Sequence, residues 1–504
     1  MLARTKSVAH VGLITQAVEV EVDVAEAGFP GFNIVGLAGK TVEEARERVK
    51  TAINNSGLEF PNKKITVNLA PADLPKEGGA YDLPIAVGIL AASNQLSIVG
   101  DQLFYGELSL DGGLRATKGV LLVALFAKES SIFVPILSAN EAAVVQDVKV
   151  FPVRNLKELV DHLNAGKQIV QLTNVPIDQL IEDAPVDFDL SEVAGQEQAK
   201  RAMLIAAAGG HNLIMTGPPG SGKTMLARAM PGIMPPLLPS EALEVTRIYS
   251  ISGLLDAGES LVRRRPFRSP HHGVSPAGII GGGSNPLPGE VSLAHLGVLF
   301  LDEMAEFPRG VLESLRQPME DGIVNIVRAA AHVEYPASFT LLAAVNPCPC
   351  GYLGHPKKEC KCTDKMIRKY ENRISGPILD RIDLHVRVSS VEVEKLSDSN
   401  SKSQIPSSKE LRSLVISARK TQAERFKNDA INTNSQMKNK HVKKYCQLDG
   451  ETQRILSLAV DRHNLSARSY FRLIKVARTI ADLDNSDKIL LNHMAEALQY
   501  RQQI

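Results

Sequence analysis

The most constraining feature of this sequence is a glycine-rich segment at residues 217–224. It reads GPPGSGKT, which has the spacing G-x-x-x-x-G-K-T of a phosphate-binding loop. Glycines allow successive backbone N–H groups to turn toward phosphate oxygens, Lys223 can reach the β- and γ-phosphates, and the Thr224 hydroxyl can hold Mg²⁺. The residues expected to contact ATP here are Gly217, Pro218, Pro219, Gly220, Ser221, Gly222, Lys223 and Thr224.

The flanking residues fit this interpretation. Residues 212–215 form a short apolar run typical of a buried strand, and residues 225–230 have helical composition. Strand, loop and helix is the context that the motif requires, and a helix N-terminus favours bound anions. The segment therefore predicts a nucleotide site with ATP and Mg²⁺ as cofactors.

Two acids follow a second apolar run at residues 297–301. Asp302 can support Mg²⁺ through water, and Glu303 can polarise an attacking water molecule. Because one acid would suffice for the metal, the second indicates hydrolysis. The alternative is a pair of solvated acids at a strand end.

Two further polar residues are candidates for sensing the nucleotide. Asn346 ends the apolar run 341–345 and could contact the γ-phosphate or the attacking water; alternatively, it is a turn residue before Pro347. Arg468 begins a helical stretch in the last part of the chain and could report nucleotide from a lid. Its alternative is an ordinary exposed arginine.

Arg381 precedes an apolar strand, where it could be presented to a neighbouring subunit. Such an arginine finger contributes about 10³–10⁵ in rate. An intrachain ion pair with Asp380 or Asp383 is the alternative.

In this order, these motifs resemble an AAA+ ATPase, and Val193 and Gln196 resemble the element that frames adenine in such modules. Three further segments, at residues 265–272, 288–295 and 346–351, resemble the magnesium-chelatase-like ComM/YifB family. The resemblance covers essentially the whole chain.

The resemblance and the residue patterns together imply a multidomain α/β fold. We expect a Lon-protease-like (ribosomal S5-like) α/β domain at 1–168 and a linker at 169–190. An AAA+ core follows at 191–395, with a parallel sheet covered on both faces, and then a helical lid at 407–504. A Gly/Pro-rich insertion at 263–289 and a cysteine cluster at 348–362 interrupt the core, and residues 397–404 read as a flexible linker. Residues 41–49 are expected to be helical, with a capping box formed by Thr41 and Glu44.

Family resemblance also implies a function. It predicts a hexameric ring that uses ATP to move on single-stranded, double-stranded or branched DNA, promoting branch migration when incoming DNA recombines during natural transformation. A metal-insertion or protein-remodelling ATPase of the magnesium chelatase type is the alternative.

Local basic clusters are the candidate DNA contacts, because the net charge of +1 gives no overall attraction to nucleic acid. They comprise Arg263, Arg264, Arg265 and Arg268 in the insertion, and Arg328 in a hairpin-like segment at 322–328. A solvated face or a subunit contact is the alternative.

Four of the five cysteines form the pattern C-x-C-x9-C-x-C at Cys348, Cys350, Cys360 and Cys362. Four thiolates could hold a structural Zn²⁺, whereas free thiols are the alternative. Cys446 lies far away and is expected to be a lone thiol.

The N-terminal domain resembles Lon-type proteases but lacks their nucleophile. Ala80 stands at the nucleophile position, and Lys118 resembles the lysine of the dyad. Without a hydroxyl for that lysine to activate, we expect no peptidase activity unless Ser56 or Ser93 substitutes.

No run approaches the roughly 20 apolar residues of a membrane span, and the first residues lack a signal-peptide core. We therefore expect a cytoplasmic protein with no membrane partner.

Overall fold

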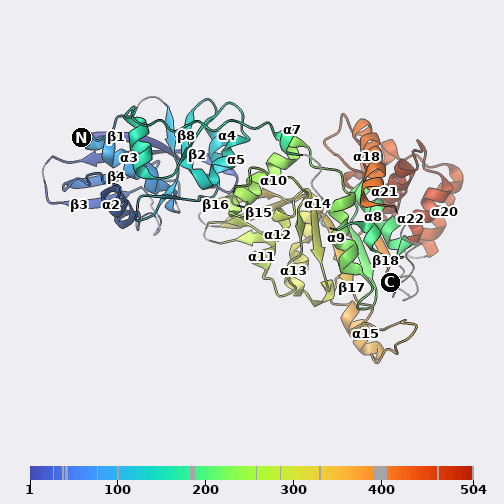
Figure 1. Cartoon of the computed structure of the whole chain (residues 1–504). Helices are drawn as coiled ribbons and strands as arrows, with labels where there is room; N and C mark the ends of the chain where they lie inside the picture. Colours follow the sequence, from blue (N-terminus) through green and yellow to red (C-terminus); the bar gives the residue numbers. More distant parts are fainter. Residues whose placement is uncertain are drawn as a thin grey trace.

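The computed structural model has three parts that follow one another along the chain (Figure 1). An N-terminal α/β part is followed by an α/β core and then by a helical part, so the predicted fold class is confirmed. The structure describes all residues except 27, 37–38, 40–41, 43, 77, 99–100, 182–187, 257, 284, 329–330, 390–405, 463–464 and 502–504. The predicted flexible linker at 397–404 lies outside the described residues.

The N-terminal part is built on a seven-stranded sheet in the order β3-β4-β2-β1-β5-β8-β9. In β2, Val18, Val20 and Val22 are buried and alternate with more exposed acids, as the sequence pattern predicts. The strands are β1 (Leu2–Val11), β2 (Ile14–Val24), β3 (Gly31–Val35), β4 (Lys64–Ala70), β5 (Gln102–Phe104), β8 (Ser131–Pro135) and β9 (Lys149–Val153). The helices are α2 (Ala45–Asn55), α3 (Asp82–Ala92), α4 (Val120–Phe126), α5 (Ala139–Ala143) and α6 (Leu156–Leu163).

The predicted helix at 41–49 is found as α2, with a later start. The helix begins at Ala45, four residues later than predicted, and Glu44 is its N-cap without a side-chain cap bond. Thr41 lies outside the described residues.

The core contains a five-stranded parallel sheet in the order β11-β14-β17-β10-β18. Its strands are β10 (Leu213–Thr216), β11 (Phe267–Arg268), β14 (Val298–Leu301), β17 (Thr340–Val345) and β18 (Leu384–Arg387). Phe300 and Leu342 pack with α8 (Glu197–Gly209) and α9 (Lys223–Ile233) on one face. Leu299 and Leu341 pack with α13 (Arg309–Ser314) on the other, which confirms the prediction of a sheet covered on both faces.

The predicted insertion at 263–289 is wrong at its start. Phe267 and Arg268 form β11, an edge strand of the core sheet that pairs with β14. Only the residues after it leave the sheet, as α11 (Pro276–Ile280) and the short ribbon β12 (Gly281–Gly282) and β13 (Leu287–Pro288), followed by α12 (Glu290–Leu293). The predicted hairpin forms as β15 (Ile323–Arg328) and β16 (Ala331–Pro336).

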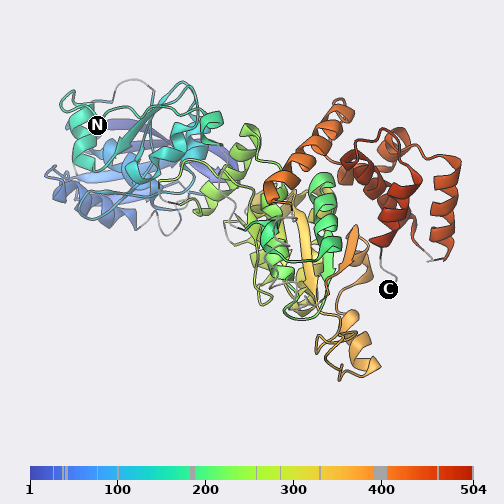
Figure 2. The ribbon, with the colours of Figure 1, turned by 45° about the vertical axis from the view of Figure 1, so that its right-hand side comes forward.

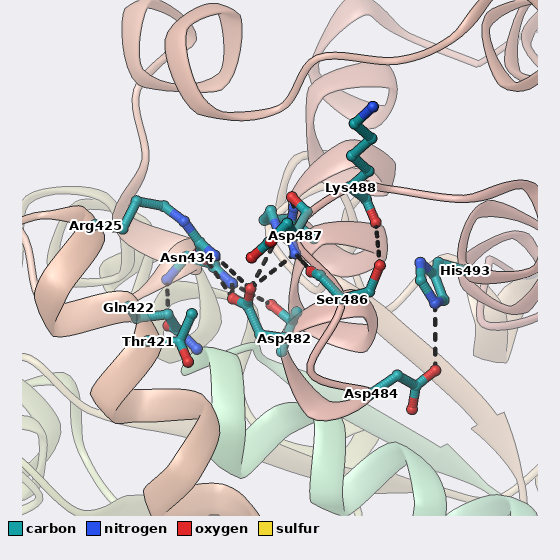
Figure 3. A network of polar contacts seen from close by, with 12 residues as sticks. Thr421, Gln422, Arg425, Asn434, Asp482, Asp484, Ser486, Asp487, Lys488 and His493 are labelled. Carbon is teal, nitrogen blue, oxygen red and sulfur yellow. Dashed lines mark hydrogen bonds and ion pairs between the residues drawn. The ribbon is translucent and has the colours of Figure 1, made fainter.

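The C-terminal part is helical. It contains α18 (Ser408–Arg425), α19 (Asn439–Tyr445), α20 (Gly450–Arg462), α21 (Ala467–Leu483) and α22 (Leu491–Gln499). Asp482, which is fully buried, accepts hydrogen bonds from Arg425 and Asn434 (Figure 3). It also accepts one from Arg478. Because an unpaired buried charge is costly, this network holds α18 and α21 together.

The N-terminal part and the core share one apolar cluster. Val120 and Val123 of α4 pack with Ala242 and Val245 of α10 (Pro239–Ser252). At the same junction, the Ser250 hydroxyl of α10 donates a hydrogen bond of 2.5 Å to Glu141 of α5. The two parts therefore contact each other through buried side chains rather than only through the linker.

This junction is predicted to be pH-sensitive. Burial raises the pKa of Glu141 to about 7, against the donors Ser250 and Leu121 N–H, which lower it. The pKa of Glu141 is higher in the folded chain than in the unfolded chain, so protonated Glu141 favours the folded state. Its contribution to the free energy of unfolding is complete below the unfolded pKa of about 4.5 and is lost as the pH rises through 7. The loss is on the order of 3 kcal/mol. Glu141→Gln should raise the Tm at pH 8 and flatten its decline from pH 5 to 8, whereas exposed Glu47→Gln should not. An unchanged pH profile would contradict this prediction.

Candidate nucleotide site

The glycine-rich loop leaves β10 and enters α9. Gly220 and Gly222 have φ angles of 75° and 89°, in the left-handed region that glycine adopts without strain. A Cβ on Gly217 would lie 2.1 Å from the Val388 carbonyl oxygen. The loop conformation therefore requires glycine at these positions, and it ends at the helix N-terminus, where the dipole favours phosphate.

Lys223 is held within the loop. Its Nζ donates to the carbonyl oxygens of Gly217 at 2.7 Å and Pro218 at 2.8 Å, and it lies 3.4 Å from Asn346 Oδ1. Burial lowers the pKa of Lys223, and the charges of Asp302 and Glu303 oppose this shift. Phosphate oxygens would be stronger acceptors than these carbonyls, so nucleotide binding can draw the ammonium outward.

The two predicted acids meet the loop at the sheet edge. The Thr224 hydroxyl donates to Asp302 Oδ2 at 2.9 Å, although the two residues are 78 positions apart. A hydroxyl and a carboxylate together are oxygen ligands suited to Mg²⁺. Next to them, Glu303 is exposed and has a φ of 51°, which is uncommon for a residue with a side chain and is typical of functional sites.

The adenine-framing candidates lie against the loop. Gln196 Nε2 donates to the Ser221 carbonyl at 3.3 Å and to the Ser389 carbonyl at 2.6 Å. Val193 is buried beside the core cluster. Gln196 thus connects the loop to the segment that follows β18.

Arg381 differs from its predicted setting. It is only 5% exposed, and its guanidinium pairs with Glu320 of α14 (Arg316–Asp321) at 2.5 Å, not with Asp380 or Asp383. A second bond reaches the Pro377 carbonyl at 2.6 Å. In this conformation Arg381 is engaged within its own chain.

Arg468 is exposed in the first turn of α21, and its helix is tied to the core by a network that the sequence analysis missed. Asp383 pairs with Arg472 at 3.0 Å and with His211 Nδ1 at 3.1 Å. Burial alone would raise the pKa of Asp383, but Arg472 and His211 outweigh it and hold that pKa well below its usual range. No sequence spacing links Asp383 to Arg472, because they are 89 positions apart.

Known protein families match most of the chain. Three family models match: "Magnesium chelatase, subunit ChlI" at residues 189–396, "Subunit ChlI of Mg-chelatase" at 20–140, and "Magnesium chelatase, subunit ChlI C-terminal" at 406–501. The chain is 41% identical to competence protein ComM of Haemophilus influenzae, covering 99% of this chain and 97% of the relative. It is 43% identical to YifB of Salmonella typhimurium over the same shares.

The chain belongs to the ComM/YifB family. Its members are magnesium-chelatase-like AAA+ proteins, so the predicted resemblance is confirmed. A partial similarity to Lon protease 2 of Bacillus subtilis, 25% identical over 182 residues, covers 32% of this chain and 31% of that protein. Among the described residues, no helix has the length and apolar character needed to cross a membrane.

In this ComM/YifB chain, the four clustered cysteines converge. The Sγ atoms of Cys348, Cys350 and Cys360 are 3.4–3.6 Å apart, and the ligand atoms of all four cysteines, including Cys362, lie within 4.8 Å of one another. A Zn²⁺ with bonds of about 2.3 Å to four thiolates needs sulfur separations of about 3.8 Å. The geometry therefore fits a tetrahedral zinc ion.

The cysteine cluster also contacts the phosphate-binding loop. A Cβ on Gly351, whose φ is 81°, would lie 2.6 Å from the Pro219 side chain. Cys348 is fully buried and comes two residues after Asn346. Any metal bound here would order both sides of the nucleotide site.

Two of the residues predicted to contact DNA, Arg265 and Arg268, have partners within the chain. Arg265 donates to the carbonyls of Pro235 and Leu296 and pairs with Glu241, and burial lowers its pKa. Arg268 forms two bonds of 2.7 Å to Glu290. Both guanidinium groups are used within the chain. The other three candidates, Arg263, Arg264 and Arg328, are exposed.

The two residues that resemble the Lon-type dyad positions come together in the N-terminal part. Ala80 and Lys118 line one cavity of about 460 Å³, which the core also lines with Asn285 and Tyr335. Ser56 and Ser93 are not among its lining residues; their hydroxyls donate to backbone carbonyls of Ala52 and of Ile89, respectively.

Proposed function

We propose that this chain is an ATP-hydrolysing, ring-forming motor that moves on DNA and promotes branch migration when incoming DNA recombines during natural transformation. One observation carries the ATPase part of the proposal. The Thr224 hydroxyl contacts Asp302, and Glu303 is the next residue. Two oxygen ligands for Mg²⁺ and a carboxylate that can activate water therefore lie beside the glycine-rich loop.

Each residue at this site has a chemical role in the proposal. Lys223 and the loop N–H groups neutralise the phosphates, and Thr224 and Asp302 hold Mg²⁺. Glu303 orients the attacking water, and Asn346, which is 3.4 Å from Lys223 Nζ, senses the γ-phosphate. Arg468 reports nucleotide from the helical lid, with Val193 and Gln196 framing the base.

The DNA and ring parts of the proposal rest on different support. One relative of 41% identity over nearly the whole chain is named a competence protein. A ring of six subunits would allow Arg381 to leave Glu320 and stabilise the transition state in a neighbour's site. Arg263, Arg264 and Arg328 would contact the DNA phosphates.

A structural Zn²⁺ is part of the proposal, and its removal has a predicted effect. The purified chain should contain about one zinc ion, and chelation should lower the Tm by at least about 2–4 °C, because each 1 kcal/mol lost shifts the Tm by that amount in a large domain. Cys360→Ser should lose the zinc, whereas Cys446→Ser should keep it. A fully folded, metal-free preparation would refute the zinc assignment.

A second candidate is a metal-insertion or protein-remodelling ATPase. It is favoured by the family models, all three of which name the magnesium chelatase subunit ChlI. Such a motor would act on a protein or a metal complex, so DNA would not alter its rate.

ATP hydrolysis with and without DNA separates the two candidates. We expect the turnover of the full chain to rise at least severalfold with branched, double-stranded or single-stranded DNA, most with the substrate on which it moves. A flat response to all three DNAs would reject the motor and leave the chelatase-like candidate.

A further inference from the structure

A basic arm projects from the core between the cysteine cluster and β18. We define the basic arm as residues 352–373, which include α15 (Asp364–Glu371). In both views, α15 projects away from the rest of the chain (Figures 1 and 2). The arm holds seven Lys and Arg residues against three Asp and Glu residues, a net charge of +4, whereas the whole chain carries +1. The other 482 residues therefore carry −3.

Loading the cysteine cluster with zinc would reduce this charge without removing it. Zn²⁺ with four thiolates carries a net charge of −2, which nearby lysines would offset. The arm with its metal would keep a net charge of +2, still opposite in sign to the rest of the chain. The basic character of the arm is therefore more than compensation for the metal site.

The cations of α15 lie on one exposed face. Lys365, Arg368 and Lys369 are spaced at i, i+3 and i+4, so they share a side of the helix, and all three are exposed. Tyr370, on another side, is buried. Among the described residues, none of these three cations has a carboxylate partner within ion-pair distance, unlike Arg373, which pairs with Glu306 at 2.5 Å.

The charged face continues into a hollow at the root of the arm. This hollow has a volume of about 410 Å³, and its lining includes Arg309 and Lys369 together with the Arg373–Glu306 pair. Arg309 comes from α13, on the face of the sheet opposite to α9, and no ion pair within the described part of the chain engages it. Two cations from separate elements thus converge on one concave surface.

Resting on the proposed function, we propose that the basic arm and Arg309 form a contact surface for the phosphate backbone of double-stranded DNA. Lysine is depleted from the cores of protein–protein interfaces, whereas Lys and Arg clustered along a helix are the footprint of nucleic-acid binding. Phosphate contacts from flexible side chains carry no sequence information, as suits a motor that moves along any DNA.

The arm also gives DNA a physical route to the nucleotide site. Its first turn begins directly after Gly351, which packs against Pro219 of the phosphate-binding loop. The arm follows Asn346 by only six residues. DNA that shifts the arm would therefore shift both the loop and Asn346.

The test compares two variants of the full chain that lose the same number of positive charges. The arm variant carries Arg309→Gln, Lys365→Gln, Arg368→Gln and Lys369→Gln. The control variant carries Lys128→Gln, Lys149→Gln, Lys157→Gln and Lys167→Gln, which are exposed positions in the N-terminal part. Each is titrated with a labelled 40-base-pair duplex at several salt concentrations, after its Tm and zinc content have been matched to the parent chain.

We expect the arm variant to bind the duplex at least about tenfold more weakly. The slope of log K against log salt should become shallower by about 2 to 4, because each lost phosphate contact removes about 0.9. The control should stay within about twofold in affinity.

Equal effects in both variants would show that only net charge matters, and an unchanged arm variant would show that DNA binds elsewhere; either result overturns this inference. Failure of the inference is distinct from failure of the proposed function, because the parent chain would still be stimulated by DNA in the first case and not in the second.

Discussion

Replacing Glu303 by Gln should leave ATP binding nearly unchanged and lower ATP turnover by about 10²–10⁴-fold, the usual contribution of a general base. The amide keeps the shape of the side chain but cannot accept the proton of the attacking water. Because the Glu303 side chain is exposed and the proposed Mg²⁺ ligands are Thr224 and Asp302, ATP binding should not require Glu303. Nucleotide affinity and phosphate release, measured on the same preparation, separate the two effects.

The matched control for this change is Glu424→Gln, an exposed acid of α18 in the helical lid. It should alter neither the affinity nor the turnover. If Glu303→Gln hydrolysed ATP at close to the parent rate, another group would have to activate the water, and the assignment of Glu303 would be wrong.

Arg381→Ala should lower ATP turnover by about 10³–10⁵-fold if the arginine acts on a neighbouring subunit. The same change also breaks the buried pair with Glu320, so a loss of activity alone could reflect a damaged fold. The decisive measurement is therefore complementation. Subunits with Arg381→Ala keep Lys223, and subunits with Lys223→Ala keep Arg381, so a mixed ring contains intact composite sites.

Each variant should be inactive by itself, whereas an equal mixture should recover activity at about a quarter of the subunit interfaces, if subunits mix at random. A mixture as inactive as its components, with both variants folded and assembled, would place Arg381 in a structural role within its own chain. The control mixture joins Lys223→Ala subunits with Glu303→Gln subunits. Each change damages the nucleotide site of the subunit that carries it, so this mixture should stay inactive.

Local spacing was sufficient to predict most of the residues that lie together at the candidate nucleotide site. The loop, the acids after β14 and Asn346 after β17 each follow an apolar strand, and parallel strands bring their carboxyl ends to one edge. The Thr224–Asp302 contact then follows from the topology. Strand β11 was missed because it is only two residues long, too short for any periodicity to appear.

The arginine contacts could not be predicted, because they depend on tertiary structure. Arg265 and Arg268 look like a basic cluster in the sequence, but Glu241 and Glu290 reach them only after the core has folded. The same holds for Arg381, whose partner Glu320 is 61 positions away rather than next to it. The sequence shows the charge of the basic arm, with seven Lys and Arg residues in 22. It does not show that α15 projects from the core, which makes these residues a candidate contact surface.

The apolar cluster shared by α4 and α10 limits which fragments of this chain can be stable by themselves. A fragment that begins after residue 190 would expose Leu237, Ala242 and Val245 to water, so it should aggregate rather than behave as an autonomous ATPase. Since α10 follows α9 directly, and α9 starts at Lys223, the N-terminal part is anchored one helix away from the proposed phosphate site. A displacement of α9 would therefore be transmitted through α10 to the N-terminal part.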